Sequence, residues 1–281
     1  MTLTVVSSSK HFGGKLTKYS HPSTATQCDM VFNVFLPKIA AEDNVKVPVL
    51  YCLGGLTSTE DNFAIKAGAA MRASQYGLAL VFPDTSPRNV GFPEAGVDQE
   101  VGYSAGFYLN ATQTPWDKNF KMYDYIAKEL PSLVAANLPI GGHGAMSIFL
   151  KNQESYKSVS AFAPILHPSV SHWGLHAFPK YLGEDRSTWK EYDTIELIKH
   201  YASEGKLRKD VTFLIDQGTG DVFYKDRLNT MDLVHAVKDL GIEDQFVVRH
   251  QDGYDHGYFF ISTFVNDHID HHAKYLGLSL N

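Results

Sequence analysis

The sequence predicts an α/β fold built on a doubly wound, mostly parallel sheet. Short apolar runs alternate with segments of helical spacing along most of the 281 residues, which is the pattern of such a fold. The run LALVF (78–82) has no polar alternation, as expected of a parallel strand covered on both faces. With 44% hydrophobic residues and no linker or repeat, we expect a single domain over residues 1–281.

The individual elements follow from local composition and periodicity. Runs rich in Val, Phe and Leu predict strands at 30–36, 47–52, 78–82, 159–162, 211–215 and 246–249. Helices are predicted at 60–76, 119–137, 189–202, 228–240 and 258–276. In the first helix, Phe63, Ala67 and Met71 recur on one side. In such a sheet, function is expected at the carboxyl ends of the strands.

Composition excludes several classes of function. A net charge of −6 and a pI near 6.1 argue against binding nucleic acid through a basic face. Two cysteines, Cys28 and Cys52, are too few for a disulfide framework. No signal peptide and no run of about 18 apolar residues is present, so we expect no membrane association and a cytoplasmic protein with reduced thiols.

Two apolar runs near the C-terminus each end in a loop with a candidate catalytic side chain. Asp221 follows VTFLIDQGTG, and His256 follows QFVVRHQDGYD. An acid after the penultimate strand and a histidine after the last one is the order in which α/β-hydrolases carry two members of a Ser–Asp–His triad. The sequence therefore predicts an α/β-hydrolase fold in which Asp221 orients His256.

Other residues compete for these roles. An isolated histidine such as His256 is more often a packing or helix-terminal residue, and the Asp221 loop is what favours catalysis. Asp216 directly follows its expected strand, so we expect it to cap or brace the turn. Asp255 is next to His256 in the sequence, and we expect it to point the other way.

The segment YCLGGLTSTEDNF (51–63) predicts a strand that ends in Gly54–Gly55 and leads into a helix. Paired glycines let the backbone turn tightly and point N–H groups outward, which suits an oxyanion hole. The alternative is a plain strand-to-helix turn with a Thr or Ser cap. Beside Asp221 and His256, the oxyanion interpretation is favoured.

One literal G-x-S-x-G sequence occurs, with Ser104 at its centre. A nucleophile elbow needs an apolar strand before the serine and a helix after it. Here PEAGVDQEV precedes the motif and FYLNATQTPW follows it. We therefore expect a Gly-rich loop near the site rather than a nucleophile.

Three histidines near the C-terminus, His268, His271 and His272, lie on the last predicted helix. His268 and His272 have the i, i+4 spacing of a zinc pair, but no glutamate completes an H-E-x-x-H motif. We expect a solvated, cationic helix end that the helix dipole favours. No metal and no cofactor are predicted.

Several longer segments together resemble one family. They are CLGGLTSTEDNF, VFPDTSPR, AGFYLNAT, MYDYIAKELP, GGHGAMSIFLKN, YKSVSAFAPI, FPKYLGED and GYDHGYFFISTFVNDHIDHHAKYLG. In one collinear register, from about Phe12 to Leu276, they closely resemble S-formylglutathione hydrolase, also called esterase D. The resemblance implies an α/β-hydrolase that converts S-formylglutathione to glutathione and formate in formaldehyde detoxification.

The resemblance also implies roles for individual residues. Asp221 matches the triad acid of the family and His256 its base. Leu56 matches the residue whose backbone N–H contributes to the oxyanion hole, and Trp173 matches an aromatic wall of the substrate pocket. The substrate would be S-formylglutathione or a small acyl ester, and a homodimer is possible within the family.

One departure from the family is large. The family's GGHGA segment follows a Gly-His-Ser-Met turn that closes a short apolar strand. Here Gly141–Gly142 follows LPI directly, so the nucleophilic serine and its strand, roughly ten residues, are missing between Ile140 and Gly142. Ser147 cannot replace the serine, because we expect it a full turn into the helix. Smaller departures are Ser58 for a family cysteine and Glu100–Val101 for Trp-Asp.

Three hypotheses follow. The first is an S-formylglutathione hydrolase whose sequence here has lost a segment through a gene-model or splicing error. The second is a family member that has lost catalysis and acts as a binding or interaction protein. The third, ranked last, is a hydrolase that uses Ser104. Losing a central strand together with the serine favours an error over an evolved loss.

Overall fold

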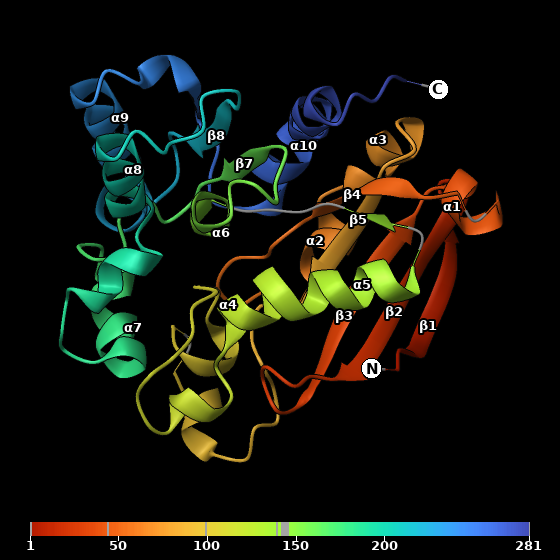
Figure 1. Cartoon of the computed structure of the whole chain (residues 1–281), viewed down its shortest axis with the longest axis horizontal. Helices are drawn as coiled ribbons and strands as arrows, with labels where there is room; N and C mark the ends of the chain where they lie inside the picture. Colours follow the sequence, from red (N-terminus) through yellow and green to blue (C-terminus); the bar gives the residue numbers. More distant parts are fainter. Residues whose placement is uncertain (1, 44, 99, 139, 142–145, 281) are drawn as a thin grey trace. The chain divides into compact units, whose positions relative to one another are not determined.

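The computed structural model describes residues 2–43, 45–98, 100–138, 140–141 and 146–280. Parallel strands and helices alternate over most of the chain, which confirms the predicted α/β class (Figure 1). The chain divides into two compact units, Met1–His143 with Leu276–Asn281, and Gly144–Tyr275. The boundary between His143 and Gly144 falls beside the place where the sequence lacks a segment.

Unit 1 contains a six-stranded sheet in the order β1-β2-β3-β5-β4-β6. Its first four strands are antiparallel, and β4 is parallel to both of its neighbours. The strands are β1 Thr4–His11, β2 Gly14–Pro22, β3 Asp29–Leu36, β4 Val47–Tyr51, β5 Ala79–Pro83 and β6 Ile140–Gly141. Figure 1 shows α5, in green, crossing in front of the red and orange strands.

The first two strands were not predicted from the sequence. They form a hairpin around Phe12 and Gly13, whose φ angles of 43° and 76° give the twist of a tight two-residue turn. Every residue of β1 except His11 is exposed, so this edge strand has no buried apolar face. Its sequence consequently lacks the alternation that marks a half-buried strand.

The helices of unit 1 are shorter than predicted. They are α1 Lys38–Asp43, α2 Glu60–Lys66, α3 Ala69–Gln75, α4 Met122–Asp124 and α5 Leu130–Asn137, with a π-helical turn at Tyr125–Glu129. The single helix expected at 60–76 is wrong, because Gly68 adopts a left-handed φ of 75° and ends α2. The helix expected from Asn119 begins at Met122, since the Asn119 side chain is buried and donates to the Thr26 carbonyl at 2.7 Å.

The strand β6 is the shortest in the molecule's described part. Its two residues, Ile140 and Gly141, pair in parallel with Val47 and Pro48 of β4. A typical strand has about five or six residues. Residues 139 and 142–145, on either side of β6, lie outside the described residues, so the expectation of a missing strand stays a prediction.

Unit 2 contains a parallel three-stranded sheet in the order β7-β8-β9, formed by Val159–Phe162, Phe213–Gly218 and Phe246–Gln251. All six residues of the central strand β8 are buried. Phe213 stacks on Phe246 of the neighbouring strand with ring centroids 4.5 Å apart. The expected strand at 211–215 stops three residues early, because polar Asp216 and Gln217 continue the pairing with β9.

The helices of unit 2 are α6 Met146–Lys151, α7 His172–Leu182, α8 Thr194–Ser203, α9 Thr230–Asp239 and α10 Tyr258–Tyr275. Side-chain caps begin two of them: Ser171 accepts from the Gly174 N–H, and Asp193 accepts from the Glu196 N–H. The helix α7, which carries Trp173, was not predicted. The long final helix α10 was predicted at 258–276, within one residue of its C-terminal end.

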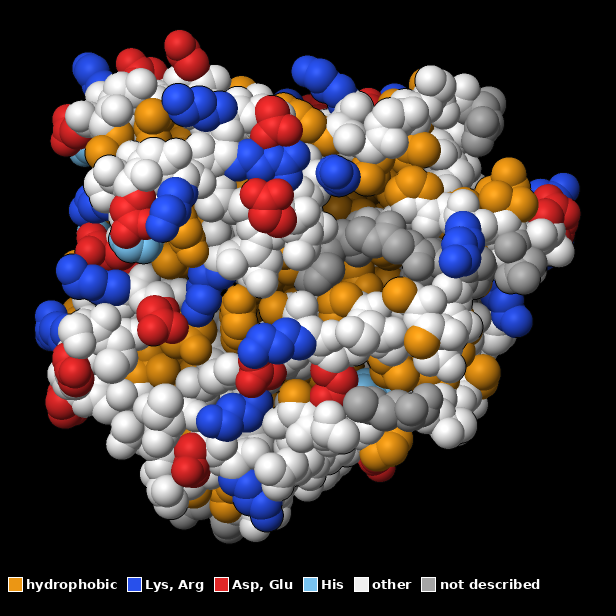
Figure 2. All heavy atoms as spheres, in the orientation of Figure 1, with side chains coloured by type: hydrophobic (Ala, Val, Ile, Leu, Met, Phe, Trp, Pro, Cys, Tyr) orange, Lys and Arg blue, Asp and Glu red, His pale blue; other side chains and the backbone are white. Residues whose placement is uncertain are grey.

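Side chains of both charge signs are interspersed on the face that Figure 2 shows, with apolar side chains between them. Among the described residues, no helix combines the length and apolar character needed to cross a membrane.

Candidate active site

The structure brings Asp221 and His256 of unit 2 together. The His256 Nδ1 atom lies 2.7 Å from the Asp221 Oδ2 atom. Asp221 is buried, whereas the His256 side chain is 38% exposed. Within the described part of the chain, the His256 Nε2 atom makes no hydrogen bond. A histidine held through Nδ1 with an accessible Nε2 has the arrangement needed to accept a proton from a nucleophile.

Two loops that follow neighbouring parallel strands position this pair. Asp221 follows β8 and His256 follows β9, and the Gly220 N–H donates to the Tyr254 carbonyl at 3.0 Å to join the loops. A Cβ atom on Gly218 would lie 2.2 Å from the Tyr254 carbonyl oxygen. Glycine is therefore required where the two loops meet, and a larger residue would separate Asp221 from His256.

The Asp221 carboxylate is held from several sides. Its Oδ1 accepts from the Phe223 N–H at 2.8 Å, and its Oδ2 also accepts from the Gln217 side chain at 3.1 Å. Gln217 is itself fixed by the Thr230 hydroxyl at 3.0 Å. Burial raises the pKa of Asp221, but the hydrogen bonds from His256, Phe223 and Gln217 outweigh burial and lower the pKa below its ordinary value. The carboxylate is consequently ionised and its orientation is fixed.

Aromatic and cationic side chains line one side of His256. The Phe223 ring meets the imidazole edge-on with centroids 5.2 Å apart, and the Trp173 centroid lies 6.4 Å from it. Arg227 places its guanidinium 5.0 Å from the Trp173 ring and 5.3 Å from the Phe223 ring. The resemblance pointed to Trp173. Phe223 and Arg227 were missed, although both follow Asp221 closely in the sequence.

The Gly54–Leu56 loop belongs to unit 1 and follows β4. Thr57 adopts a left-handed φ of 64°, and Thr59 begins α2 with a capping box in which Asn62 participates. The Leu56 N–H donates no hydrogen bond to any residue that the structure describes. An N–H that is free in this way can bind an oxyanion, so both the predicted oxyanion interpretation and the simpler capped turn describe this loop.

Three side chains form hydrogen bonds to the carbonyl groups of this loop. The Ser58 carbonyl accepts from the Thr85 hydroxyl at 2.6 Å and from the Arg88 guanidinium at 3.1 Å. The Tyr108 hydroxyl donates to the Gly54 carbonyl at 2.7 Å. Side-chain hydrogen bonds to loop carbonyls fix the direction of the neighbouring N–H groups, which is the preorganisation that oxyanion binding needs.

Ser104 lies in a 3₁₀ turn, Gly102–Ser104, that follows another 3₁₀ turn at Pro93–Gly96. Neither a strand before it nor a helix after it forms an elbow in the described residues. Gly106, two residues later, packs against the loop that carries Leu56: a Cβ atom there would lie 3.1 Å from the Leu56 nitrogen. The Gly-rich loop thus lies against the Leu56 loop, and its place near the catalytic site stays a prediction.

The place expected for the nucleophile, between Ile140 and Gly142, adjoins residues 142–145, which are outside the described residues. The described part of α6 begins at Met146, so Ser147 lies in its first described turn. The sequence itself contains no serine between Ile140 and Met146. The absence of an elbow serine is therefore known from the amino-acid sequence alone.

Two expectations about neighbouring polar residues are wrong. Asp216 does not cap a turn, because it lies inside β8, is fully buried and pairs with Arg249 at 2.5 Å. His268 and His272 are not solvated, since each is 3% exposed. Burial also lowers the pKa values of both imidazoles, so neither is cationic at neutral pH. Helical spacing shows which residues share a face, but the residues opposite that face come from elsewhere in the chain.

The other candidate residues have structural surroundings. The Asp255 carboxylate accepts from the Gly257 N–H at 2.8 Å, and among the described residues no hydrogen bond or ion pair joins it to His256. Cys52 is buried and Cys28 half-buried, and burial raises the pKa of both thiols. Neither thiol is activated as a nucleophile, because nucleophilic attack requires the thiolate.

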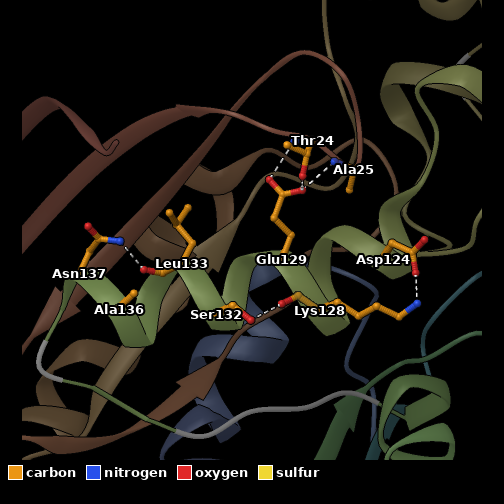
Figure 3. Close-up of a pocket in the computed structure, with 9 residues that line it drawn as sticks. All are labelled: Thr24, Ala25, Asp124, Lys128, Glu129, Ser132, Leu133, Ala136 and Asn137. Carbon is orange, nitrogen blue, oxygen red and sulfur yellow. Dashed lines mark hydrogen bonds and ion pairs between the residues drawn. The ribbon is translucent and has the colours of Figure 1, made fainter. Parts of the chain in front are cut away.

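A surface pocket of about 540 Å³ lies in unit 1, between α5 and the Thr24–Ala25 loop (Figure 3). The Glu129 carboxylate accepts from the Thr24 N–H, the Thr24 hydroxyl and the Ala25 N–H at 2.7–3.1 Å. On the other side, Lys128 pairs with Asp124 at 2.6 Å. The polar groups that line this pocket already bond one another, and none of the predicted site residues is among them.

Comparisons with known proteins define the class first. The family model described as "Putative esterase" matches residues 23–271. Fluorophosphonate-binding serine hydrolase F of Staphylococcus aureus has the same fold, with a TM-score of 0.68, at 17% identity over 92% of this chain and 97% of that chain. The protein is therefore an esterase of the α/β-hydrolase class, as the fold and the Asp221–His256 pair indicated.

More similar proteins define the family. S-formylglutathione hydrolases of Arabidopsis thaliana and Bos taurus are 44% and 45% identical over 98% of this chain and 99% of their own lengths. A solved S-formylglutathione hydrolase from Agrobacterium tumefaciens has a TM-score of 0.89 at 38% identity, over 97% of this chain and 99% of that chain. The chain belongs to the S-formylglutathione hydrolase family.

The alignments also bear on the missing segment. Those with the Arabidopsis and bovine proteins extend over 289 residues, whereas this chain has 281. The relatives therefore carry residues that have no counterpart here.

Proposed function

We propose that this protein is built to hydrolyse S-formylglutathione, or small acyl thioesters and esters, to a free acid and a thiol or alcohol. His256 is the general base, Asp221 orients and stabilises it, and the Leu56 N–H stabilises the oxyanion. The observation that carries the proposal is the 2.7 Å hydrogen bond between Asp221 and His256, in a chain whose relatives are S-formylglutathione hydrolases.

The reaction follows from these roles once a serine is supplied. The serine oxygen attacks the thioester carbonyl while its proton passes to the His256 Nε2 atom. The oxyanion that develops accepts from the Leu56 N–H. Collapse of the intermediate expels the thiolate, which receives the proton from His256 and leaves as glutathione. Water, deprotonated by His256, then attacks the formyl ester and releases formate.

The side chains around His256 support a glutathionyl substrate. Glutathione carries two carboxylates and is anionic at neutral pH, and Arg227 supplies a cation beside Trp173 and Phe223. A guanidinium stays charged at all ordinary pH values and attracts carboxylates. We propose that Trp173 and Phe223 form the apolar wall for the small acyl group and that Arg227 attracts the anionic carrier.

A second candidate function is a catalytically inactive family member that binds a ligand or a partner protein. The lack of an elbow serine between Ile140 and Gly142 favours it. A hydrolase that uses Ser104 ranks third, because Ser104 lies in a 3₁₀ turn rather than on an elbow. Under all three, we propose a single α/β-hydrolase domain that acts in the cytoplasm without metal or cofactor and binds neither nucleic acid nor membrane, with a homodimer as its candidate assembly.

Two measurements separate these candidates. The intact mass of the natural protein, compared with 31.3 kDa, shows whether that protein contains a segment that the sequence lacks. Hydrolysis of S-formylglutathione by a chain with the segment restored, and its loss in Asp221→Asn, tests the mechanism. A restored chain that folds and has no thioesterase activity would contradict the proposed function.

A further inference from the structure

A second Asp–His pair connects β8 to α10 within unit 2. Asp216 lies on β8 and Asp221 in the loop that follows it, whereas His256 lies two residues before α10 and His268 within that helix. The His268 Nε2 atom lies 3.3 Å from the Asp216 Oδ2 atom, and both side chains are buried. This buried pair thus joins β8 to α10, and the candidate catalytic pair joins the loops next to them.

The buried pair belongs to a larger hydrogen-bond network. Arg249 of β9 holds both carboxylate oxygens of Asp216 at 2.5 Å. The Ser160 hydroxyl of β7 lies 2.8 Å from His268 Nδ1 and 2.9 Å from His272 Nε2. The Ser158 hydroxyl lies 2.7 Å from His272 Nδ1. All three strands of the sheet therefore contact α10 through polar groups, most of them buried.

The network requires neutral imidazoles. His268 faces Asp216 from β8, Arg249 from β9 and Ser160 from β7, while its ring stacks on Phe162 at 3.7 Å. Asp267, His271, His272 and Lys274 are the other titratable groups of α10 at this interface. Burial lowers the pKa values of all three histidines, that of His271 to about 4. If His268 and His272 were both doubly protonated, the two imidazolium cations would repel each other, and Arg249 nearby, in this buried setting.

We propose that Asp216, His268 and His272 are positioning residues. While the imidazoles of His268 and His272 are neutral, the three side chains fix α10 to the sheet and thereby hold His256 against Asp221. The catalytic meaning of this role rests on the proposed function, but the positioning itself does not.

The chain connectivity explains how the network acts on His256. Helix α10 begins at Tyr258, and the Asp255 carboxylate caps the N–H of Gly257 between them. Within the described residues, the bond to Asp221 is the one hydrogen bond of the His256 side chain. The His256 side chain is 38% exposed and held by one hydrogen bond. Its position therefore depends on α10, which begins two residues later. Displacement of α10 would therefore move His256 directly.

A proton NMR experiment on the 281-residue chain tests the proposal without needing enzyme activity. The imidazole Nδ1–H of His256 bonded to Asp221 gives a downfield resonance, which is assigned by its loss in His256→Gln. His268→Phe keeps the ring on Phe162 and removes both hydrogen bonds. We expect exchange of the His256 Nδ1–H with solvent to accelerate at least tenfold, the effect of losing one buried charge-assisted hydrogen bond. His235→Phe, at an exposed position of α9, should change nothing.

Acid titration of the unmodified chain supplies a second test, which holds even if His268→Phe does not fold. The proposal requires the His256 resonance to disappear together with protonation of His268 and His272. Persistence of the resonance after these histidines are protonated would overturn it. So would a folded His268→Phe variant with unchanged exchange. Lack of thioesterase activity in a chain with the nucleophile segment restored, together with an intact His256 resonance, would contradict the proposed function and leave the positioning role standing.

Discussion

Asp221 and His256 share a 2.7 Å hydrogen bond but are held very unequally. The carboxylate also accepts from Gln217 and from the Phe223 N–H, whereas the imidazole has Asp221 as its one hydrogen-bond partner among the described residues. The acid is therefore the fixed member of the pair and the base the adjustable one. This asymmetry suits a base that must take up a proton and release it again.

Replacement of Asp221 by Asn should disable the base. The amide cannot accept all the hydrogen bonds that the carboxylate accepts, so His256 loses its tautomer and orientation. In a chain with the nucleophile segment restored, we expect kcat to fall by about 10⁴, the effect known for triad acids, and stability to fall by about 1–3 kcal/mol. Steady-state kinetics and urea unfolding measure the two effects.

Asp255→Asn is the matched control, because that carboxylate caps Gly257 and not His256. It should retain kcat within a few-fold. An equal loss of kcat in both variants would show that the acid role is wrongly assigned to Asp221.

The 281-residue chain itself should hydrolyse S-formylglutathione negligibly. Asp221 and His256 can orient and move protons, but acyl transfer at neutral pH needs an activated nucleophile. Insertion of a strand and a Gly-x-Ser-x-Gly turn between Ile140 and Gly142 should raise kcat/KM by several orders of magnitude. Ser104→Ala should leave both chains unchanged. Ordinary enzyme rates that Ser104→Ala abolishes would instead support the third hypothesis.

Arg227→Gln should weaken binding of an anionic glutathione derivative. We expect the Kd of S-methylglutathione to rise about three- to tenfold, as for a partly exposed charge pair, while the Kd of its diethyl ester stays constant. Calorimetry on the existing chain measures both. The control is Arg186→Gln, because Arg186 stacks on Trp189 in the same way but not beside His256. Equal loss for the acid and the ester would indicate a packing role.

Unit 2 should lose stability as the pH falls from about 6.5 to about 4. Burial lowers the pKa values of His268, His271 and His272, the second to about 4, so the unfolded chain binds more protons than the folded chain in this window. Stability is then complete above pH 6.5 and falls by up to about 1.4 kcal/mol per pH unit for each histidine. The lowered pKa values of Asp216 and Asp221 extend the loss to lower pH. Urea unfolding at a series of pH values checks this, and a flat profile would contradict it.

Thiol-alkylating reagents should not inactivate a restored, active chain. Ser58 stands where the family has a cysteine, and burial raises the pKa values of Cys28 and Cys52, so little thiolate is present at neutral pH. Mass spectrometry should find Cys52 labelled far more slowly in the native chain than in urea. Rapid inactivation together with labelling of Cys52 would show that the chain at the end of β4 opens readily.

The sequence predicted the parts of the molecule whose signal is local. The apolar run at 159–162 coincides with β7, and the run at 246–249 covers the first four residues of β9, since Val and Phe favour strands. The hairpin of β1 and β2 was missed, because an exposed edge strand buries too little apolar surface to show alternation. The break at Gly68 was missed because apolar spacing continues across it.

For the candidate site, the order of Asp221 and His256 along the chain was enough to predict that they meet, because loops that follow neighbouring parallel strands lie at the same edge of a sheet. The sequence also determined that no serine lies between Ile140 and Met146, which only residue identity can show. Tertiary structure decided which charges are buried. Asp216 was assigned to a turn and His268 to a solvated helix end, yet Asp216 pairs with both His268 and Arg249. Their partners come from three separate segments, and the protonation of a side chain depends on the groups that packing places around it, not on its neighbours in sequence.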